Sequence, residues 1–150
     1  MIQRIQTIYL LVASLLMASL SFIGVATVNL SGDIFILDGT GFMSLDESLF
    51  YERWGLILLL ILSSLTPMVA IFLYNKRVLQ MRFTMFSALI SLGMVAAFIF
   101  YGHQYLGGTL EGFKPTYAFA FPFVAIILEL LAYRGIAIDH RTIKYADRLR

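Results

Sequence analysis

The sequence predicts an all-α integral membrane protein, a bundle of four transmembrane helices with both termini on the cytoplasmic side. Of the 150 residues, 60% are hydrophobic and only 13% are charged, whereas an ordinary soluble domain has roughly 25% charged residues. The charged residues leave four long gaps in the chain. The basic residues are concentrated in the segments that would lie on one side of the membrane, which indicates the orientation of the bundle.

The gaps between charged residues predict four membrane spans. A helix needs about 20 mainly apolar residues to cross a bilayer. The first three gaps are at least this long, and the fourth is shorter because Glu129 interrupts its apolar run. Uncharged stretches separate Arg4 from Asp33, Arg53 from Lys76, Arg82 from Glu111, and Lys114 from Glu129. We therefore predict spans over residues 5–28, 54–74, 83–101 and 116–133, followed by a cytoplasmic tail over residues 134–150. Residues 1–150 are expected to form one transmembrane domain.

The first span also has features of a cleaved signal peptide. Arg4 precedes the apolar stretch, and Gly24-Val25-Ala26 resembles a cleavage site. The apolar stretch is, however, longer than the roughly 7 to 15 residues of a usual signal-peptide core. We therefore expect this segment to be retained as the first transmembrane helix.

The two sides of the predicted bundle carry opposite charge. The side with both termini and the 75–82 loop has nine basic and two acidic residues, a net charge of +7. The other side has two basic and six acidic residues, a net charge of −4. Because basic loops stay in the cytoplasm, we expect the termini to be cytoplasmic and the 29–53 and 102–114 loops to lie outside.

The first outer loop is expected to contain a β-hairpin. Ile34–Leu37 is a β-type run, and the turn residues Asp38, Gly39 and Gly41 follow it. Ser44 and Glu47 have capping-box spacing, which predicts a short helix before the second span. This loop could cap the bundle, contact a partner, or be a plain acidic connector. The second outer loop is rich in glycine and is expected only to connect two spans.

Proline residues predict kinks in two of the spans. Pro67 lies in the second predicted span and Pro122 in the fourth. A proline inside a helix lacks the N–H that the ladder needs and bends the helix. Broken helices form substrate sites in some transporters, but an isolated proline kink is more often structural.

Glu129 is a lone carboxylate inside the fourth predicted span. Arg134 follows five residues later, about 140° around the helix, so it is not a suitable partner. We expect Glu129 to face another helix and to serve as an interhelical polar anchor, through a salt bridge or a hydrogen bond. A proton-carrying role is the alternative, although a proton relay needs further members. The cations expected at a similar depth are Arg4, Lys76, Arg77 and Arg82.

The cytoplasmic tail has a basic helical pattern. If the fourth helix continues past Tyr133, Asp139 falls on the face away from the cations. The basic stripe then consists of Arg134, Arg141, Lys144 and Arg148. Such a stripe could bind anionic lipid headgroups at about 1 kcal/mol per cation, dock on an acidic protein surface, or act only as a topology signal. Nucleic acid is the less favoured partner. Lys76, Arg77 and Arg82 form a second basic segment in the cytoplasmic loop.

Catalytic and metal-binding motifs are missing from the sequence. The chain contains neither GxSxG nor HExxH nor a glycine-rich phosphate loop. It has no cysteine, and the predicted topology places His103 and His140 on opposite sides of the membrane. We therefore expect no enzymatic activity, no cofactor and no metal.

Three segments of the chain resemble a known family. They are MIQRIQTIYL at the start, NKRVLQMR between the second and third spans, and LAYRGIAIDHRTIKYADRLR at the end. Together they resemble a Bacteroidota family of small four-span inner-membrane proteins, a domain of unknown function, over essentially the whole chain. The resemblance implies a Gram-negative inner membrane and a periplasmic outer side. It implies no activity, ligand or catalytic residue.

Two functions remain open at this point. The preferred hypothesis is a non-catalytic accessory or assembly subunit of an inner-membrane complex. The alternative is a small oligomeric transporter or lipid-handling protein whose path is lined by Pro67, Pro122 and Glu129. The expected partners are anionic membrane lipids and heterologous membrane proteins, and a homo-oligomer is also compatible with the sequence.

Overall fold

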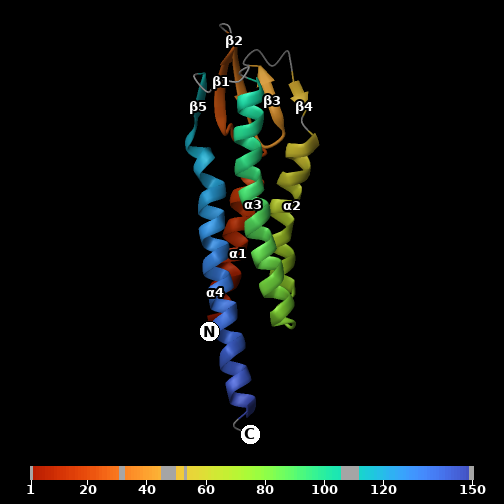
Figure 1. Cartoon of the computed structure of the whole chain (residues 1–150), viewed down its shortest axis with the longest axis vertical. Coiled ribbons are helices and arrows are strands. Elements are labelled where there is room, and N and C mark those ends of the chain that lie inside the picture. Colours follow the sequence, from red (N-terminus) through yellow and green to blue (C-terminus); the bar gives the residue numbers. More distant parts are fainter. Residues whose placement is uncertain (1, 31–32, 45–49, 53, 106–111, 149–150) are drawn as a thin grey trace.

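A computed structural model describes residues 2–30, 33–44, 50–52, 54–105 and 112–148. The described residues form a mainly helical bundle with a small antiparallel sheet at one end (Figure 1). The helices are α1 (Ile2–Ser19), α2 (Trp54–Phe72), α3 (Arg77–Tyr105) and α4 (Phe121–Arg148), with a 3₁₀ turn at Tyr117–Ala120. The strands are β1 (Ala26–Leu30), β2 (Asp33–Leu37), β3 (Gly41–Ser44), β4 (Phe50–Glu52) and β5 (Phe113–Pro115).

The four helices run alternately up and down. Neighbours around the bundle follow the chain order, so that α1 contacts α2 and α4, and α3 contacts α2 and α4. The sheet covers one end, which we call the sheet end. At the opposite end, the tail end, α4 projects beyond the start of α1 and the turn between α2 and α3 (Figure 1).

Apolar side chains cover the outside of the bundle, while its interior contains many polar groups. Every helix has exposed large apolar residues, among them Leu15, Leu58, Phe86 and Ile127. Among the described side chains, the buried polar ones are Gln6, Ser14, Ser63, Thr66, Gln80, Thr84, Ser87, Ser91 and Glu129. A water-soluble bundle would show the opposite pattern. The segments Trp54–Phe72, Arg77–Gln104 and Tyr117–Thr142 are long and apolar enough to cross a membrane, which is consistent with a membrane protein.

The first helix is shorter than the sequence predicted. The predicted span reaches residue 28, but α1 ends at Ser19 and the chain enters β1 at Ala26. Val25, Thr27 and Val28 are β-branched residues that favour strands, and β1 lies between two partner strands that complete its hydrogen bonds. Pairing with distant segments therefore overrides the apolar run that suggested a longer helix.

The sheet has the strand order β4-β3-β2-β1-β5, and all neighbours are antiparallel. The predicted hairpin is confirmed, because β2 pairs with β3 and Leu37 lies opposite Phe42. Asp38 closes its turn by accepting hydrogen bonds from the backbone N–H groups of Thr40 (2.7 Å) and Gly41 (2.9 Å).

The outer loops contain more structure than the sequence predicted. The second loop was expected only to connect two spans, but its residues 113–115 form β5, which pairs with β1. The helix expected from Ser44 and Glu47 falls on residues 45–49, which lie outside the described residues. Just after them, residues 50–52 form β4 against β3.

The sheet and the nearby helix ends share one hydrophobic core. Its strand members include Val28, Leu37 and Phe42, and its helix members include Leu56 and Phe98. Because these side chains form a continuous buried cluster, the sheet packs as part of the bundle and holds all four helices at this end.

The two prolines lie in different settings. Pro67 is buried inside α2, and the kink expected there stays a prediction. Pro122 is the second residue of α4, because α4 begins at Phe121. A proline in the first turn of a helix needs no N–H and is tolerated without a bend, so the structure gives no reason for a kink within α4.

Glycine at position 39 is required by a close backbone approach. A Cβ atom there would lie 2.8 Å from the carbonyl oxygen of Leu20, whereas a Cβ at Gly93 would lie 3.9 Å from its nearest neighbour, in Leu59. We expect Gly39→Ala to lower the free energy of unfolding in detergent by about 1–3 kcal/mol. Gly93→Ala is the matched control and should be neutral or stabilising by up to about 1 kcal/mol. Equal stability of the two variants would contradict this packing.

Candidate functional site

Glu129 lies at the centre of the polar interior. It is fully buried in α4, with an exposed fraction of 0%. Its two carboxyl oxygens accept hydrogen bonds from serine hydroxyls of α3: Ser87 donates to Oε1, and Ser91 lies 3.3 Å from Oε2. Glu129 therefore joins α4 to α3 through hydrogen bonds.

The cations proposed as partners of Glu129 lie elsewhere. Arg77 is close to Asp139, with 3.7 Å between Nη1 and Oδ2, while Lys76 and Arg82 are exposed. The side chain of Arg4 lies outside the described part of the chain. The sequence did contain a signal for the serines, because Ser87 and Ser91 are four residues apart and so share one helix face.

A second polar cluster ties the helices together at the tail end. Asp139 of α4 accepts a hydrogen bond from Gln6 Nε2 of α1 at 2.8 Å and lies beside Arg77 of α3. Gly135 allows this arrangement, because a Cβ at that position would lie 2.9 Å from the Gln6 side chain. We call Gln6, Arg77 and Asp139 the tail-end clasp. The sequence pattern placed Asp139 away from the basic stripe without showing what it contacts.

Hydroxyl groups make further polar contacts inside the bundle. Ser14 of α1 donates to the carbonyl oxygen of Ser64 in α2 at 2.7 Å. Ser63, Thr66 and Thr84 instead donate to carbonyl oxygens three or four residues earlier in their own helices, as serine and threonine commonly do in helices. Side-chain hydrogen bonds thus link α1 to α2 and to α4, and α3 to α4.

The polar interior does not continue to the sheet end in the part of the chain that the structure describes. Beyond Ser14, Ser63 and Ser91, the buried side chains of the first three helices are apolar. They include Met17, Leu56, Leu60, Met94 and Phe98, which join the core beneath the sheet. We call these five residues the apolar plug.

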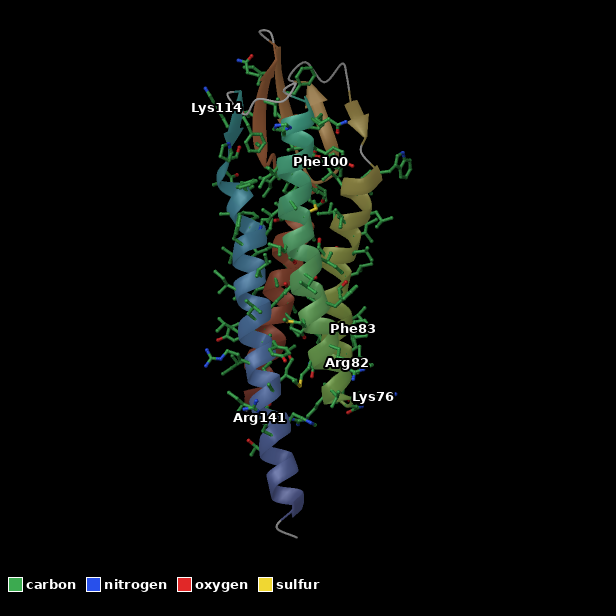
Figure 2. All side chains as sticks on the ribbon, viewed as in Figure 1. Lys76, Arg82, Phe83, Phe100, Lys114 and Arg141 are labelled. Carbon is green, nitrogen blue, oxygen red and sulfur yellow. The ribbon has the colours of Figure 1, made fainter. Side chains whose placement is uncertain are left out.

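Basic residues are concentrated at the tail end. Figure 2 shows Lys76, Arg82 and Arg141 near this end and Lys114 at the sheet end. Arg134 and Arg141 of the predicted stripe are exposed. The side chains of its other members, Lys144 and Arg148, lie outside the description. The predicted basic loop is largely helical, because α3 already begins at Arg77.

Comparison with known proteins places the chain in a family. Residues 2–149 match a family described as a domain of unknown function (DUF4293). The chain belongs to this family. No curated protein and no solved structure matches it. The expectation of a whole-chain match to a family of unknown function is thereby confirmed.

The contact between Glu129 and Ser87 can be tested in this DUF4293 chain by a double-mutant cycle. Glu129→Leu removes the acceptor of both serine hydroxyls and should lower the free energy of unfolding in detergent by about 1–3 kcal/mol. In that background, Ser87→Ala should cost less than in the parent, with a coupling of about 0.5–2 kcal/mol.

The control for this cycle is Thr142→Ala. Thr142 is exposed and donates to Ile138 in its own helix, about 20 Å along α4 from Glu129. Its effect should add to that of Glu129→Leu. If Ser87→Ala is also additive with Glu129→Leu, the hydrogen bond contributes nothing to stability, and the interpretation of Glu129 as an anchor fails.

Proposed function

We propose that the chain is a multi-pass protein of the bacterial inner membrane, with four spans and both ends in the cytoplasm. The outward face of α1 supports a fourth span, because it is as apolar as those of the other helices: Ile5, Ile8, Leu11, Val12 and Leu15 are all exposed. The 18 residues of α1 extend about 27 Å, close to the roughly 30 Å of the hydrocarbon core.

The charge distribution supports this orientation. Lys76, Arg82 and Arg141 mark the tail end (Figure 2), which the positive-inside rule assigns to the cytoplasm. The sheet end then faces the periplasm. The resemblance to Bacteroidota inner-membrane proteins supports the same setting.

The topology can be tested with single cysteines, because the natural chain has none. Asn75 and Lys114 are exposed at opposite ends of the bundle. In intact spheroplasts, Lys114→Cys should react with a membrane-impermeant maleimide, whereas Asn75→Cys should react only after permeabilisation. Labelling of both positions from the same side would contradict the four-span topology.

We further propose that the protein is a non-catalytic accessory or assembly subunit of an inner-membrane complex. The observation that carries this proposal is the free end of α4. Beyond Asp139, α4 continues for nine residues to Arg148, about 14 Å, and leaves the bundle (Figure 1). A single helical segment of this length gains little stability on its own in water, so a partner surface would stabilise it.

The character of the proposed partner follows from the basic stripe. The exposed Arg141 begins the projecting segment, and Lys144 and Arg148 follow at spacings of three and four residues. Residues so spaced share one helix face, so the partner is expected to be a protein with an acidic cytoplasmic surface.

The interior of the bundle supports a subunit over a transporter. A transported ion would need polar groups along the whole path, since charged groups are costly within the membrane. The described polar groups end at the apolar plug, above which the sheet packs. Glu129 is therefore better explained by its hydrogen bonds to α3 than by a route across the bundle.

The docking role of the tail is tested by moving its charges without changing the composition. The variant combines Lys144→Ala, Ala146→Lys, Asp147→Arg and Arg148→Asp, which turns these cations to other faces of the helix and leaves the tail-end clasp intact. We expect normal insertion but loss of at least about 90% of the heterologous partner in gentle detergent co-purification, roughly 1.4 kcal/mol or more of binding free energy.

A truncation after Thr142 is the second variant for this test and should lose the same partner. The parent chain, extracted in parallel, is the reference. If the rearranged tail retains all the proteins that co-purify with the parent, the stripe is only a topology signal. A parent that extracts solely as a homo-oligomer would instead favour the transporter.

A further inference from the structure

A groove runs along the outer junction of α3 and α4 at the tail end. Three adjoining hollows form it, with volumes of about 520, 330 and 380 Å³. His140 borders all three hollows, and Met81 and Tyr133 border two of them. The hollows therefore form one continuous surface feature, which we call the α3–α4 groove.

Five lysine and arginine side chains line the α3–α4 groove. One of them, Arg77, is engaged by Asp139 in the clasp, which leaves four. Lys76 and Arg82 lie on the α3 side, and Arg134 and Arg141 lie on the α4 side. All four are exposed, and none of them forms an ion pair within the described residues. The nearby acid Asp139 does not neutralise them, because its side chain is only 13% exposed and engages Gln6 and Arg77 in the clasp.

The floor of the groove is apolar and continues along the bundle. Val78, Met81 and Met85 line it on α3, and toward the sheet end the exposed apolar residues Leu89 of α3 and Leu130 of α4 follow. A ligand that occupies the groove would thus meet cations at the tail end and an apolar surface above them. Tyr133 lies between these two regions, where a ring with a polar tip suits a membrane interface.

We propose that the α3–α4 groove is a binding site for an anionic phospholipid. Its headgroup phosphate lies among Lys76, Arg82, Arg134 and Arg141, and its acyl chains follow the apolar surface toward the membrane centre. Basic pockets between helices on the cytoplasmic side recognise such headgroups. This inference rests on the proposed membrane setting and orientation, and it is independent of the proposed subunit role.

A lipid fits the groove better than a free phosphate does. The groove is open to the side, and its floor carries methionine and valine side chains that a small hydrophilic anion would not use. A phospholipid satisfies both regions at once, because its charged phosphate and its apolar chains are covalently joined. Arginine adds specificity for phosphate over other anions through its paired donors.

The test measures lipid binding to the purified full chain by native mass spectrometry. The probes are dioleoylphosphatidylglycerol and, as the zwitterionic control, dioleoylphosphatidylcholine. The parent should prefer phosphatidylglycerol. The groove variant Arg82→Gln with Arg141→Gln should bind phosphatidylglycerol roughly 10- to 30-fold more weakly, while its binding of phosphatidylcholine stays unchanged.

The tail variant Lys144→Gln with Arg148→Gln is the matched control. It removes the same charge from the same side of the membrane but leaves the groove intact, so it should keep the affinity for phosphatidylglycerol. Equal losses in the groove and tail variants would overturn the site, because binding would then follow net charge. If only the subunit proposal is wrong, no heterologous partner depends on the tail in co-purification, but the groove still binds phosphatidylglycerol.

Two further arms complete the test. Arg82→Lys with Arg141→Lys keeps both charges and should retain the preference for phosphatidylglycerol, which separates a loss of charge from a loss of fold. Glycerol 3-phosphate, which carries the phosphate without acyl chains, should not displace the lipid. Displacement at similar concentrations would show a free-phosphate site and overturn the proposal, as would parental affinity in the groove variant.

Discussion

The hydrogen bonds between helices are the interaction on which the rest of the structure depends. The outside of the bundle is apolar, so in the proposed membrane no hydrophobic force would drive its helices together. Glu129 with the α3 serines, the tail-end clasp and the contact from Ser14 to α2 supply polar attraction instead. Each such contact is worth only about 0.6 kcal/mol on average in a membrane. Several of them, combined with close packing at Gly135, are therefore needed.

The two ends of the bundle are held together by different physical means. At the tail end, polar side chains meet between helices. At the sheet end, Leu37 and Phe42 pack on the apolar plug as in the core of a soluble protein, and backbone pairing joins loops that are far apart in sequence. A sheet outside the proposed membrane has water at its face and edges, so burial of apolar surface there is favourable again.

Local patterns in the sequence predicted the helical bundle, the β2–β3 hairpin and a Glu129 side chain that faces another helix. Each of these signals, an apolar run, a set of turn residues or a single charge within an apolar run, can be read from a short stretch of sequence. The early end of α1 and the pairing of β5 with β1 depend on contacts between distant segments, which local patterns do not contain. The partners of Glu129 were missed for another reason. A serine is uncharged and common in helices, so nothing distinguished Ser87 and Ser91 as donors except their spacing.

Helix α4 connects Glu129, the tail-end clasp, the α3–α4 groove and the projecting tail. Glu129 and Asp139 attach it to the bundle at two points, about 15 Å apart along its axis. Two attachment points fix the direction of a helix, whereas one would leave it free to pivot. The segment beyond Asp139 is therefore presented at a defined angle to the bundle, with the α3–α4 groove beside its base. A lipid in that groove would brace the same part of α4 from the outside that the clasp holds from the inside.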